Sequence, residues 1–494
     1  MQIKRNMPQK ASCYSKSCRK CRKIFTPGTE IDVLNKLVLI TKSALLLALL
    51  TGCSTSAITP GVREDHAPAN WTSEIRQDPV SEAWLEDFNN EKLERMVSAA
   101  MQSNFQLAQQ QQRIEQARQS VIVSGASRYP EFTLTASGSR QRQVFAERLI
   151  GPNNNFQISG ELSFEIDLWG RLADTQKQAS LTLAAEEAGY RQARNSLAAE
   201  VSRAWFNVIS AEQLLKLFRE RLANLDVDMD IIERAYRQGL NTALDVYLTR
   251  STVEQERSRI AQQEQRLREN RTALQVLMAV YPDGNVESDE GLPLLEDQIP
   301  AGLPSELLSR RPDLQQAWWS LLAADVGLAI AHKQRFPRIS LAASASDASN
   351  ELGQLLDGSA PAWSLLGNLA QPLFNAGRLK AEEERARSQV VQAEKRYLEL
   401  LYQAFAEVEN TISRQAALQD QYDATLEADR HSSAAFELAF EQYQRGLVSY
   451  TTVLESQRRA FDAQSAVIDL RNQLLQNRIN LYLALGGNFE LENS

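Results

Sequence analysis

The chain has 494 residues, more than the roughly 100–200 residues of one ordinary compact domain, so it holds two or three domains or one very elongated one. Its 43% hydrophobic and 23% charged residues exclude wholesale disorder. Residues 1–52 carry a net charge of +8 and the whole chain −8, which leaves −16 for residues 53–494. This acidic body argues against a nucleic-acid partner, because phosphate binding needs a surplus of lysine and arginine.

The first segment, residues 1–52, is interpreted as a signal region. Two lysines come before a short apolar run at 43–50, which cannot span a bilayer because a spanning helix needs about 20 residues. The run ends in Leu-Thr-Gly-Cys at 50–53, which resembles a bacterial lipobox. That resemblance implies that Cys53 is lipidated and becomes the first mature residue, and that Ser54 favours sorting to the outer membrane. The alternative is a buried apolar segment with an incidental cysteine.

Three further cysteines, Cys13, Cys18 and Cys21, come before this run. A zinc site would need a fourth ligand, and the local sequence offers none. We expect these residues to lie in a segment that is removed or never translated. Because signals usually start close to their apolar run, we expect translation to begin near Val33 or Leu34.

The rest of the chain is a duplication, with one repeat over 85–282 and another over 305–489. Both 335 − 128 and 377 − 170 give an offset of 207 residues, and the same offset relates pairs spread over some 150 residues. The matched pairs include Arg128-Tyr129-Pro130 with Arg335-Phe336-Pro337, Gly170-Arg171-Leu172 with Gly377-Arg378-Leu379, and Gly239-Leu240 with Gly446-Leu447. The proline-rich acidic stretch between the repeats, 283–304, is typical of a linker.

Each repeat begins with a helical segment, at 90–127 and 304–334, and ends in two very long helices. We expect the long helices at about 171–238, 240–281, 378–445 and 447–485, because these tracts contain no proline before Tyr281 or Leu485 and almost no glycine. Apolar residues recur along them in steps of four and three, as at Leu197, Val201, Ala204 and Val208. This spacing predicts coiled-coil packing.

Between these helices, each repeat has two strand-like stretches, at about 129–143, 156–169, 337–347 and 363–374. In 157–168, apolar residues alternate with polar ones, which include Glu161, Glu165 and Asp167. Apolar-out and polar-in alternation over about ten residues is typical of a membrane barrel around water, so these carboxylates are candidate lumen residues. A half-buried soluble sheet is the alternative. Four strands cannot close a membrane barrel, so spanning strands would require several chains to share one.

Aromatic residues lie where these strands are expected to end. They are Phe156, Trp169, Trp363 and Phe374. Aromatic side chains gather at the two interfaces of a membrane, so their placement agrees with spanning strands.

Several motifs resemble those of the TolC/OprM-type outer-membrane efflux proteins. They are Phe-Glu-Ile-Asp-Leu-Trp-Gly-Arg at 164–171, Leu-Pro-Ser-Glu-Leu-Leu-Ser-Arg-Arg-Pro-Asp-Leu at 303–314, Phe-Pro-Arg-Ile-Ser-Leu at 336–341 and Leu-Phe-Asn-Ala-Gly-Arg-Leu at 373–379. The resemblance implies a mixed α and β fold, mainly α. Each chain of a homotrimer would give four strands to a twelve-stranded barrel and long helices to a periplasmic α-helical barrel.

The resemblance also implies partners and a role. The chain would be the lipid-anchored outer-membrane channel of a tripartite efflux pump, docking a periplasmic adaptor and, through it, an inner-membrane pump of the RND type. The cargo would be drugs or other toxic small molecules, and the chain would need no cofactor. An equatorial belt would be built from 53–84, from the linker and from the chain end.

The turns that join the long helices are the candidate docking tip. By resemblance, Gly239 with Leu240, and Gly446 with Leu447, Val448 and Ser449, would contact the adaptor. Relatives close this tip with an Asp, a Tyr and an Arg, which correspond here to Asp245, Tyr443 and Val448. Glu455 matches a position in an acidic constriction ring, and Thr452 replaces another. The alternatives are ordinary left-handed helix caps for the glycines and solvated helix-end charges for the rest.

No enzymatic constellation is found in 54–494. The segment has no cysteine, no His-Glu-x-x-His, no Gly-x-Ser-x-Gly and no phosphate-binding glycine loop. His66, His332 and His431 are isolated, so neither an enzyme nor a metal site is expected. Two other functions stay open: the duct of a type I protein secretion system, and a lipid-anchored coiled-coil scaffold without a pore.

Overall fold

The computed structural model describes residues 68, 70–72, 84–145, 148–286, 288, 291–294, 301–355, 357 and 361–487. All of them belong to one unit of the chain, Ile58–Ser494. The signal region and Cys53 therefore lie outside the described residues.

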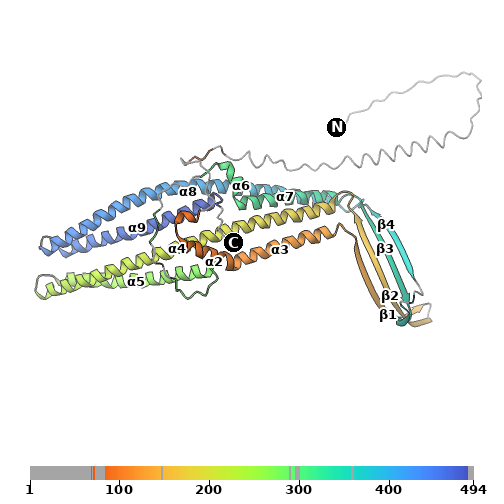
Figure 1. Cartoon of the computed structure of the whole chain (residues 1–494), viewed down its shortest axis with the longest axis horizontal. Coiled ribbons are helices and arrows are strands. Elements are labelled where there is room, and N and C mark those ends of the chain that lie inside the picture. Colours follow the sequence, from red (N-terminus) through yellow and green to blue (C-terminus); the bar gives the residue numbers. More distant parts are fainter. Residues whose placement is uncertain are drawn as a thin grey trace, which may run out of the picture. The chain divides into compact units, whose positions relative to one another are not determined.

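Both repeats contain the same order of elements: short helices, two strands and two long helices (Figure 1). The first repeat comprises η2 (Glu86–Phe88), α2 (Glu91–Ser103), α3 (Phe105–Ala126), β1 (Glu131–Phe145), β2 (Arg148–Ile166), α4 (Arg171–Arg237) and α5 (Ala243–Leu277). The second comprises η3 (Pro304–Glu306), α6 (Leu307–Arg310), α7 (Pro312–Lys333), β3 (Arg338–Ser349), η4 (Leu352–Gln354), β4 (Ala362–Ala370), α8 (Arg378–Gln444) and α9 (Tyr450–Ala484).

The first helical segment of each repeat, expected at 90–127 and 304–334, is divided into consecutive helices. Asn104 adopts an extended conformation, and its side-chain oxygen accepts hydrogen bonds from the amides of Gln106 and Leu107. An asparagine in this conformation caps a new helix, so α2 ends and α3 begins there. In the second repeat, Pro312 opens α7, because proline is favoured in the first turn of a helix.

The four long helices form two antiparallel hairpins, α4 with α5 and α8 with α9. Helix α5 begins at Ala243, three residues later than expected, because Thr242 caps it. The hairpins contact each other through α4 and α9, and α7 packs between α4 and α8.

The four strands form one antiparallel sheet in the order β1-β2-β3-β4. Strand β2 starts at Arg148, eight residues before the expected 156, because it continues to pair with β1 as far as Phe145. Strand β4 ends at Ala370, so the expected end at 374 is wrong. Pro372 cannot donate a ladder hydrogen bond, and Phe374 therefore lies outside the sheet.

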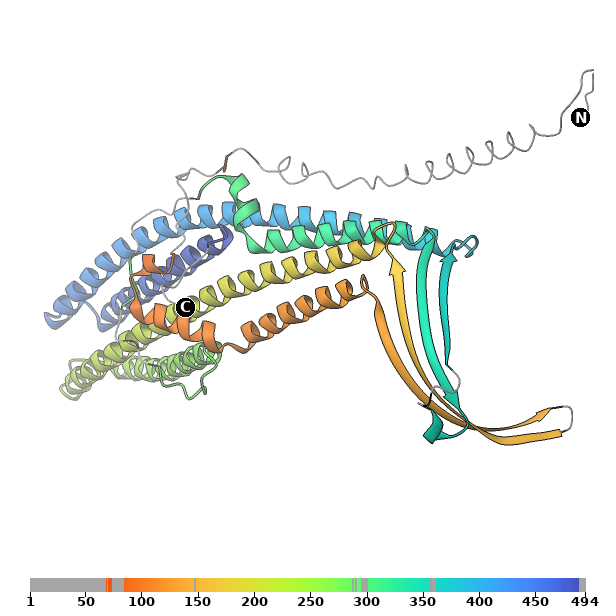
Figure 2. The ribbon, with the colours of Figure 1, turned by 45° about the vertical axis from the view of Figure 1, so that its right-hand side comes forward.

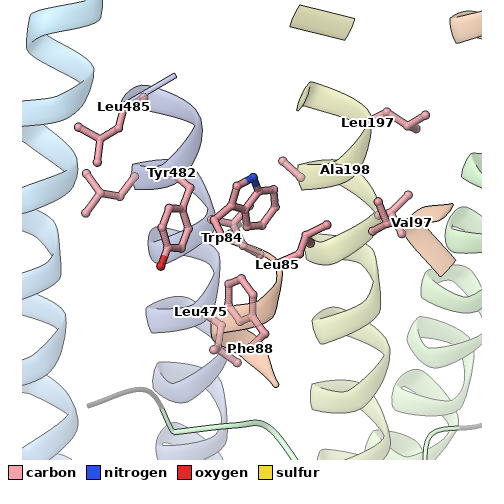
Figure 3. Packing of buried hydrophobic residues seen from close by; sticks show 14 of the residues in the cluster. Trp84, Leu85, Phe88, Val97, Leu197, Ala198, Leu475, Tyr482 and Leu485 are labelled. Atoms are coloured by element: carbon pink, nitrogen blue, oxygen red, sulfur yellow. The ribbon is translucent and has the colours of Figure 1, made fainter. Parts of the chain in front are cut away.

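Aromatic side chains from both ends of the duplication share the main core (Figure 3). Trp84 stacks on Tyr482 with ring centroids 5.4 Å apart, and Phe88 packs on Phe206 at 5.2 Å. Trp84 and Phe88 are almost completely buried, and each such side chain contributes about 1.5–3 kcal/mol by leaving water. This core joins the start of the first repeat to α4 and to the end of α9.

Candidate functional site

The register of the sheet places its apolar residues on one face. Phe132 pairs with Leu162, and Leu162 pairs with Ala343, which in turn pairs with Leu365. Directly paired residues point to the same side of a sheet. Phe132, Leu162 and Leu365 are all exposed, so this chain leaves an apolar sheet face uncovered.

The opposite face of the sheet is polar. Glu161 pairs with Thr133 on β1 and with Ser344 on β3, and Ser344 in turn pairs with Ser364 on β4. The structure thus places Glu161 among hydroxyl groups on the side away from the apolar face, which is where a lumen residue is expected.

The other two candidate lumen carboxylates hold the start of α4. The Asp167 carboxylate accepts hydrogen bonds from the amides of Leu172 and Ala173, at 3.0 and 2.8 Å. Glu165 accepts one from the Arg171 guanidinium at 2.8 Å. Carboxylates at a helix N-terminus satisfy its free amides and oppose its dipole. Asp167 and Glu165 are therefore structural groups at the junction of strand and helix.

Both tip glycines have left-handed backbones, with φ of +73°. The amide of Leu240 donates to Ala235 O and that of Leu447 donates to Gln442 O, which is the pattern of a Schellman cap. A Cβ at Gly239 or Gly446 would meet no atom within 4 Å, and both leucines are largely exposed. The left-handed caps explain why glycine occupies both positions. The exposed leucines beside them remain accessible to a partner.

The structure does not join the two expected gate residues to each other. Asp245 forms a capping box with Thr242, whose hydroxyl donates to the carboxylate at 2.7 Å. The Tyr443 hydroxyl accepts a hydrogen bond from the Asn241 amide at 2.7 Å. Within the described part of the chain, Tyr443 thus links the two turns through Asn241. Val448 is half-buried, and Ser449 is the N-cap residue of α9.

Glu455 is held by two arginines of its own helix. Its carboxylate accepts hydrogen bonds from Arg458 at 2.9 and 3.1 Å and from Arg459 at 2.8 Å. These contacts lower its pKa to about 2. The carboxylate lies at a cavity of about 250 Å³ between α5 and α9, which Arg221 and Arg259 also line. The surroundings of Glu455 are therefore not simply acidic.

Above the tip, buried polar groups connect the two hairpins. The Gln457 amide donates to the Asp228 carboxylate at 3.2 Å, and both residues are buried. Burial raises the pKa of Asp228. Arg221 lies 3.3 Å from Glu256, and its guanidinium stacks over Phe461 at 3.9 Å.

None of these groups was predicted from the sequence, although a signal for Glu256 exists. In α5, the residues three positions after the apolar heptad positions Val246, Val253 and Ile260 are Thr249, Glu256 and Gln263. A coiled-coil seam normally has apolar residues at both positions, and all three polar residues are buried.

Two kinds of feature are absent from the described residues. No group of three or more His, Cys, Asp or Glu side chains there is placed to hold a metal ion. None of the helices in that part of the chain has the length and hydropathy needed to cross a membrane.

A family model described as outer membrane efflux protein matches residues 96–280 and 303–487. The two matched segments cover both repeats. The chain belongs to the outer membrane efflux protein family. The resemblance found in the sequence motifs is thereby confirmed.

Named relatives agree with this membership. A probable efflux pump outer membrane protein of Pseudomonas putida, TtgC, is 30% identical over 471 residues, which cover 91% of this chain and 96% of the relative. The cation efflux system protein CusC of Escherichia coli K12 is 28% identical, over 89% of this chain and 97% of the relative.

Solved structures share the fold. The outer-membrane channel OprN has a TM-score of 0.81 over 88% of this chain and 99% of its own, at 23% identity. The structure of CusC has a TM-score of 0.75 over 86% and 100%, at 27% identity. This efflux protein is thus located in the outer membrane and reaches into the periplasm, and it acts in efflux.

Proposed function

We propose that this efflux protein is the outer-membrane channel subunit of a tripartite pump and works as a homotrimer. The observation that carries the proposal is the four-stranded sheet with an exposed apolar face and two edge strands, β1 and β4. An open sheet edge in lipid leaves backbone groups without hydrogen bonds, at several kcal/mol each. Pairing of β4 with β1 of the next copy removes both edges.

Three copies suit a duct better than two. Two copies would give eight strands, and the interior of an eight-stranded barrel is filled by its own side chains. Three would give the twelve strands implied by the family resemblance and leave an interior lined by the polar face, including Glu161. Cargo would pass through this interior without chemistry, so the chain is a duct and not an enzyme.

The belt proposed around the helices is supported by one long-range contact. The Trp71 indole donates a hydrogen bond to Gly302 O at 3.0 Å, and its ring packs on Phe405 of α8. This contact brings Trp71 of the first segment and Gly302 of the linker together against α8. Upstream of them, Cys53 would carry the acyl chains that anchor the protein to the outer membrane, because two or more chains give stable anchoring.

The tip would dock a periplasmic adaptor, which links the channel to an inner-membrane RND-type pump. Support comes from Leu240 and Leu447, which are 74% and 69% exposed on capped turns. Relatives of the chain are named for toluene, antibiotic and cation efflux. Their range fits a passive duct for small molecules whose pump selects the cargo.

The first experiment is the native mass of the detergent-extracted protein. A mass of three chains is expected. A stable monomer, extracted only because of its lipid, would overturn the shared barrel and favour a scaffold without a pore.

A further inference from the structure

The β1–β2 pair continues beyond the rest of the sheet. The pairing of β2 with β3 stops at Phe156 and Ser349. Strands β1 and β2 stay paired from Ser139 and Asn155 to Phe145 and Arg148. Figure 2 shows this two-stranded extension projecting from the end of the sheet that lies away from the helices. Since the helices are periplasmic, the extension is on the exterior side.

Two arginines stand at the base of this extension. Arg140 pairs with Asn154 and shares its face with Phe132 and Leu134, since residues an even number apart on a strand point to one side. Arg142 follows at the register shift between Gln141 and Gln143. Both arginines are exposed. Within the described residues, neither makes an ion pair or a side-chain hydrogen bond.

The position of Arg140 across the membrane follows from its distance along β2 from the end of the sheet beside the helices. Ile166, beside the helices, and Asn154, the partner of Arg140, are twelve residues apart. Twelve residues rise about 40 Å along a strand, or about 30 Å across a membrane at a tilt near 40°. The apolar band of such sheets is about 25 Å tall. Counted from Ile166 as the inner edge of the hydrocarbon, Arg140 lies about 5 Å beyond its outer edge, at the depth of the headgroups.

We propose that Arg140 and Arg142 bind a phosphate-bearing glycolipid of the outer leaflet. Arg140 extends the face that meets lipid acyl chains, and Arg142 follows two residues later, so an outer-leaflet lipid packed on Leu134 places its headgroup beside Arg140. A guanidinium matches a phosphate with two parallel hydrogen bonds, and it is less strongly hydrated than an ammonium. This inference requires the outer-membrane orientation of the sheet but not the adaptor, the pump or the number of copies.

A neighbouring copy is the competing occupant. Asp347 pairs with Ile158 and thus lies on the same face as Arg140, and Glu351 is exposed just after β3. If these carboxylates of another copy met the arginines, the contact would hold the oligomer together without any lipid. The test must therefore measure lipid binding and oligomer mass on the same samples.

The experiment compares the full chain with Arg140→Gln/Arg142→Gln and with Arg338→Gln as the matched control. Arg338 is an exposed arginine at the opposite end of the same sheet. Native mass spectrometry of detergent-extracted protein would titrate bis-phosphorylated lipid A and the same lipid without its phosphates. Each lost arginine–phosphate contact should weaken binding about 10-fold, so the double variant should bind about 100-fold less tightly.

Three outcomes are informative. Weaker binding in the double variant, normal binding in Arg338→Gln and a requirement for the phosphates would support the proposal. Equal affinity of the double variant and the unmodified protein would overturn it. Loss of the oligomer in the double variant without added lipid would also overturn it, because the arginines would then face another copy.

Discussion

The Asp228 carboxylate accepts a hydrogen bond from the Gln457 amide at 3.2 Å, across the contact between α4 and α9. Both residues are buried, and no cation pairs with Asp228 within the described residues. Tyr450, at the start of α9, is near enough to interact electrostatically with the carboxylate. A carboxylate so placed has lost water without gaining a counter-charge. It therefore weakens the seam between the two hairpins whenever it is ionised.

Replacing this carboxylate, Asp228→Asn, is expected to stabilise the protein at neutral pH by roughly 1–3 kcal/mol. Burial raises the pKa of Asp228 above its ordinary value of 3.8, so the folded protein holds the proton more tightly than the unfolded chain. Stability thus falls as pH rises through the folded-state pKa and stays lower above it. Thermal unfolding measured from pH 4 to 8 should show the variant's advantage only at the higher values. An equal advantage at pH 4 would contradict this account.

The Arg221–Glu256 pair predicts a different pattern. Their side chains are only 8% and 2% exposed, so Glu256→Ala would leave the Arg221 charge buried without its carboxylate. A loss of about 3–5 kcal/mol is expected. Arg221→Met/Glu256→Leu should recover most of it, because an apolar pair of similar volume is often neutral. Urea unfolding followed by helical circular dichroism measures both, and a double variant as unstable as Glu256→Ala would refute the argument.

The duplication and the long helices could be predicted because they depend on local signals. A constant offset, the absence of proline and the heptad steps are all visible in the chain. The strand register was less accessible: β2 begins at Arg148 because β1 offers it a partner, and no local pattern marks that start. The break at Asn104 carried a signal, since asparagine is a strong helix cap.

In the candidate site, too, features with a local sequence signal could be predicted, and features that depend on residues distant in the sequence could not. The capped tip turns at Gly239 and Gly446 follow from glycine's freedom at positive φ, and their place could be predicted. The partners of the charged residues could not, because they depend on three-dimensional neighbours. Asp167 accepts hydrogen bonds from the first amides of α4. Asp245 completes the capping box of Thr242 at the start of α5, and Glu455 is paired with two arginines.

The pairing of the Glu455 carboxylate with two arginines leads to a prediction about the ion selectivity of the channel. Arg458 also pairs with Asp462 at 2.8 Å, whereas Arg459 pairs with Glu455. Glu455→Gln would therefore leave Arg459 without its carboxylate and add one net positive charge at the cavity between α5 and α9. If this region lines the pore, the variant in a planar bilayer under a potassium chloride gradient should have a reversal potential closer to the chloride equilibrium potential than the unmodified protein has. Glu427→Gln is a suitable control, since Glu427 forms a comparable exposed pair with Arg430 further from the tip. An unchanged reversal potential would place Glu455 away from the ion path.

Lipidation of Cys53 can be tested by Cys53→Ala. The variant should incorporate no labelled palmitate, because the acyl chains would be carried by this residue. Its native mass should remain that of three chains, because the contacts proposed between copies lie in the sheet. Persistent palmitate labelling in the variant would refute the anchor, and monomers would show that the lipid supports assembly.

The open tip turn at Gly446 permits a test of docking that is separable from folding. Its φ of +73° disfavours other residues, although a new Cβ would meet no atom within 4 Å. Gly446→Asn, whose residue tolerates this conformation, should retain export, whereas Gly446→Trp should place a bulky group at the surface proposed for the adaptor and impair it. The strain in the second variant is about 1–2 kcal/mol, which a trimer with an intact sheet can absorb. Cargo accumulation in cells and the native mass of each variant are the measurements. Normal export by Gly446→Trp, with a normal mass, would remove this turn from the docking surface.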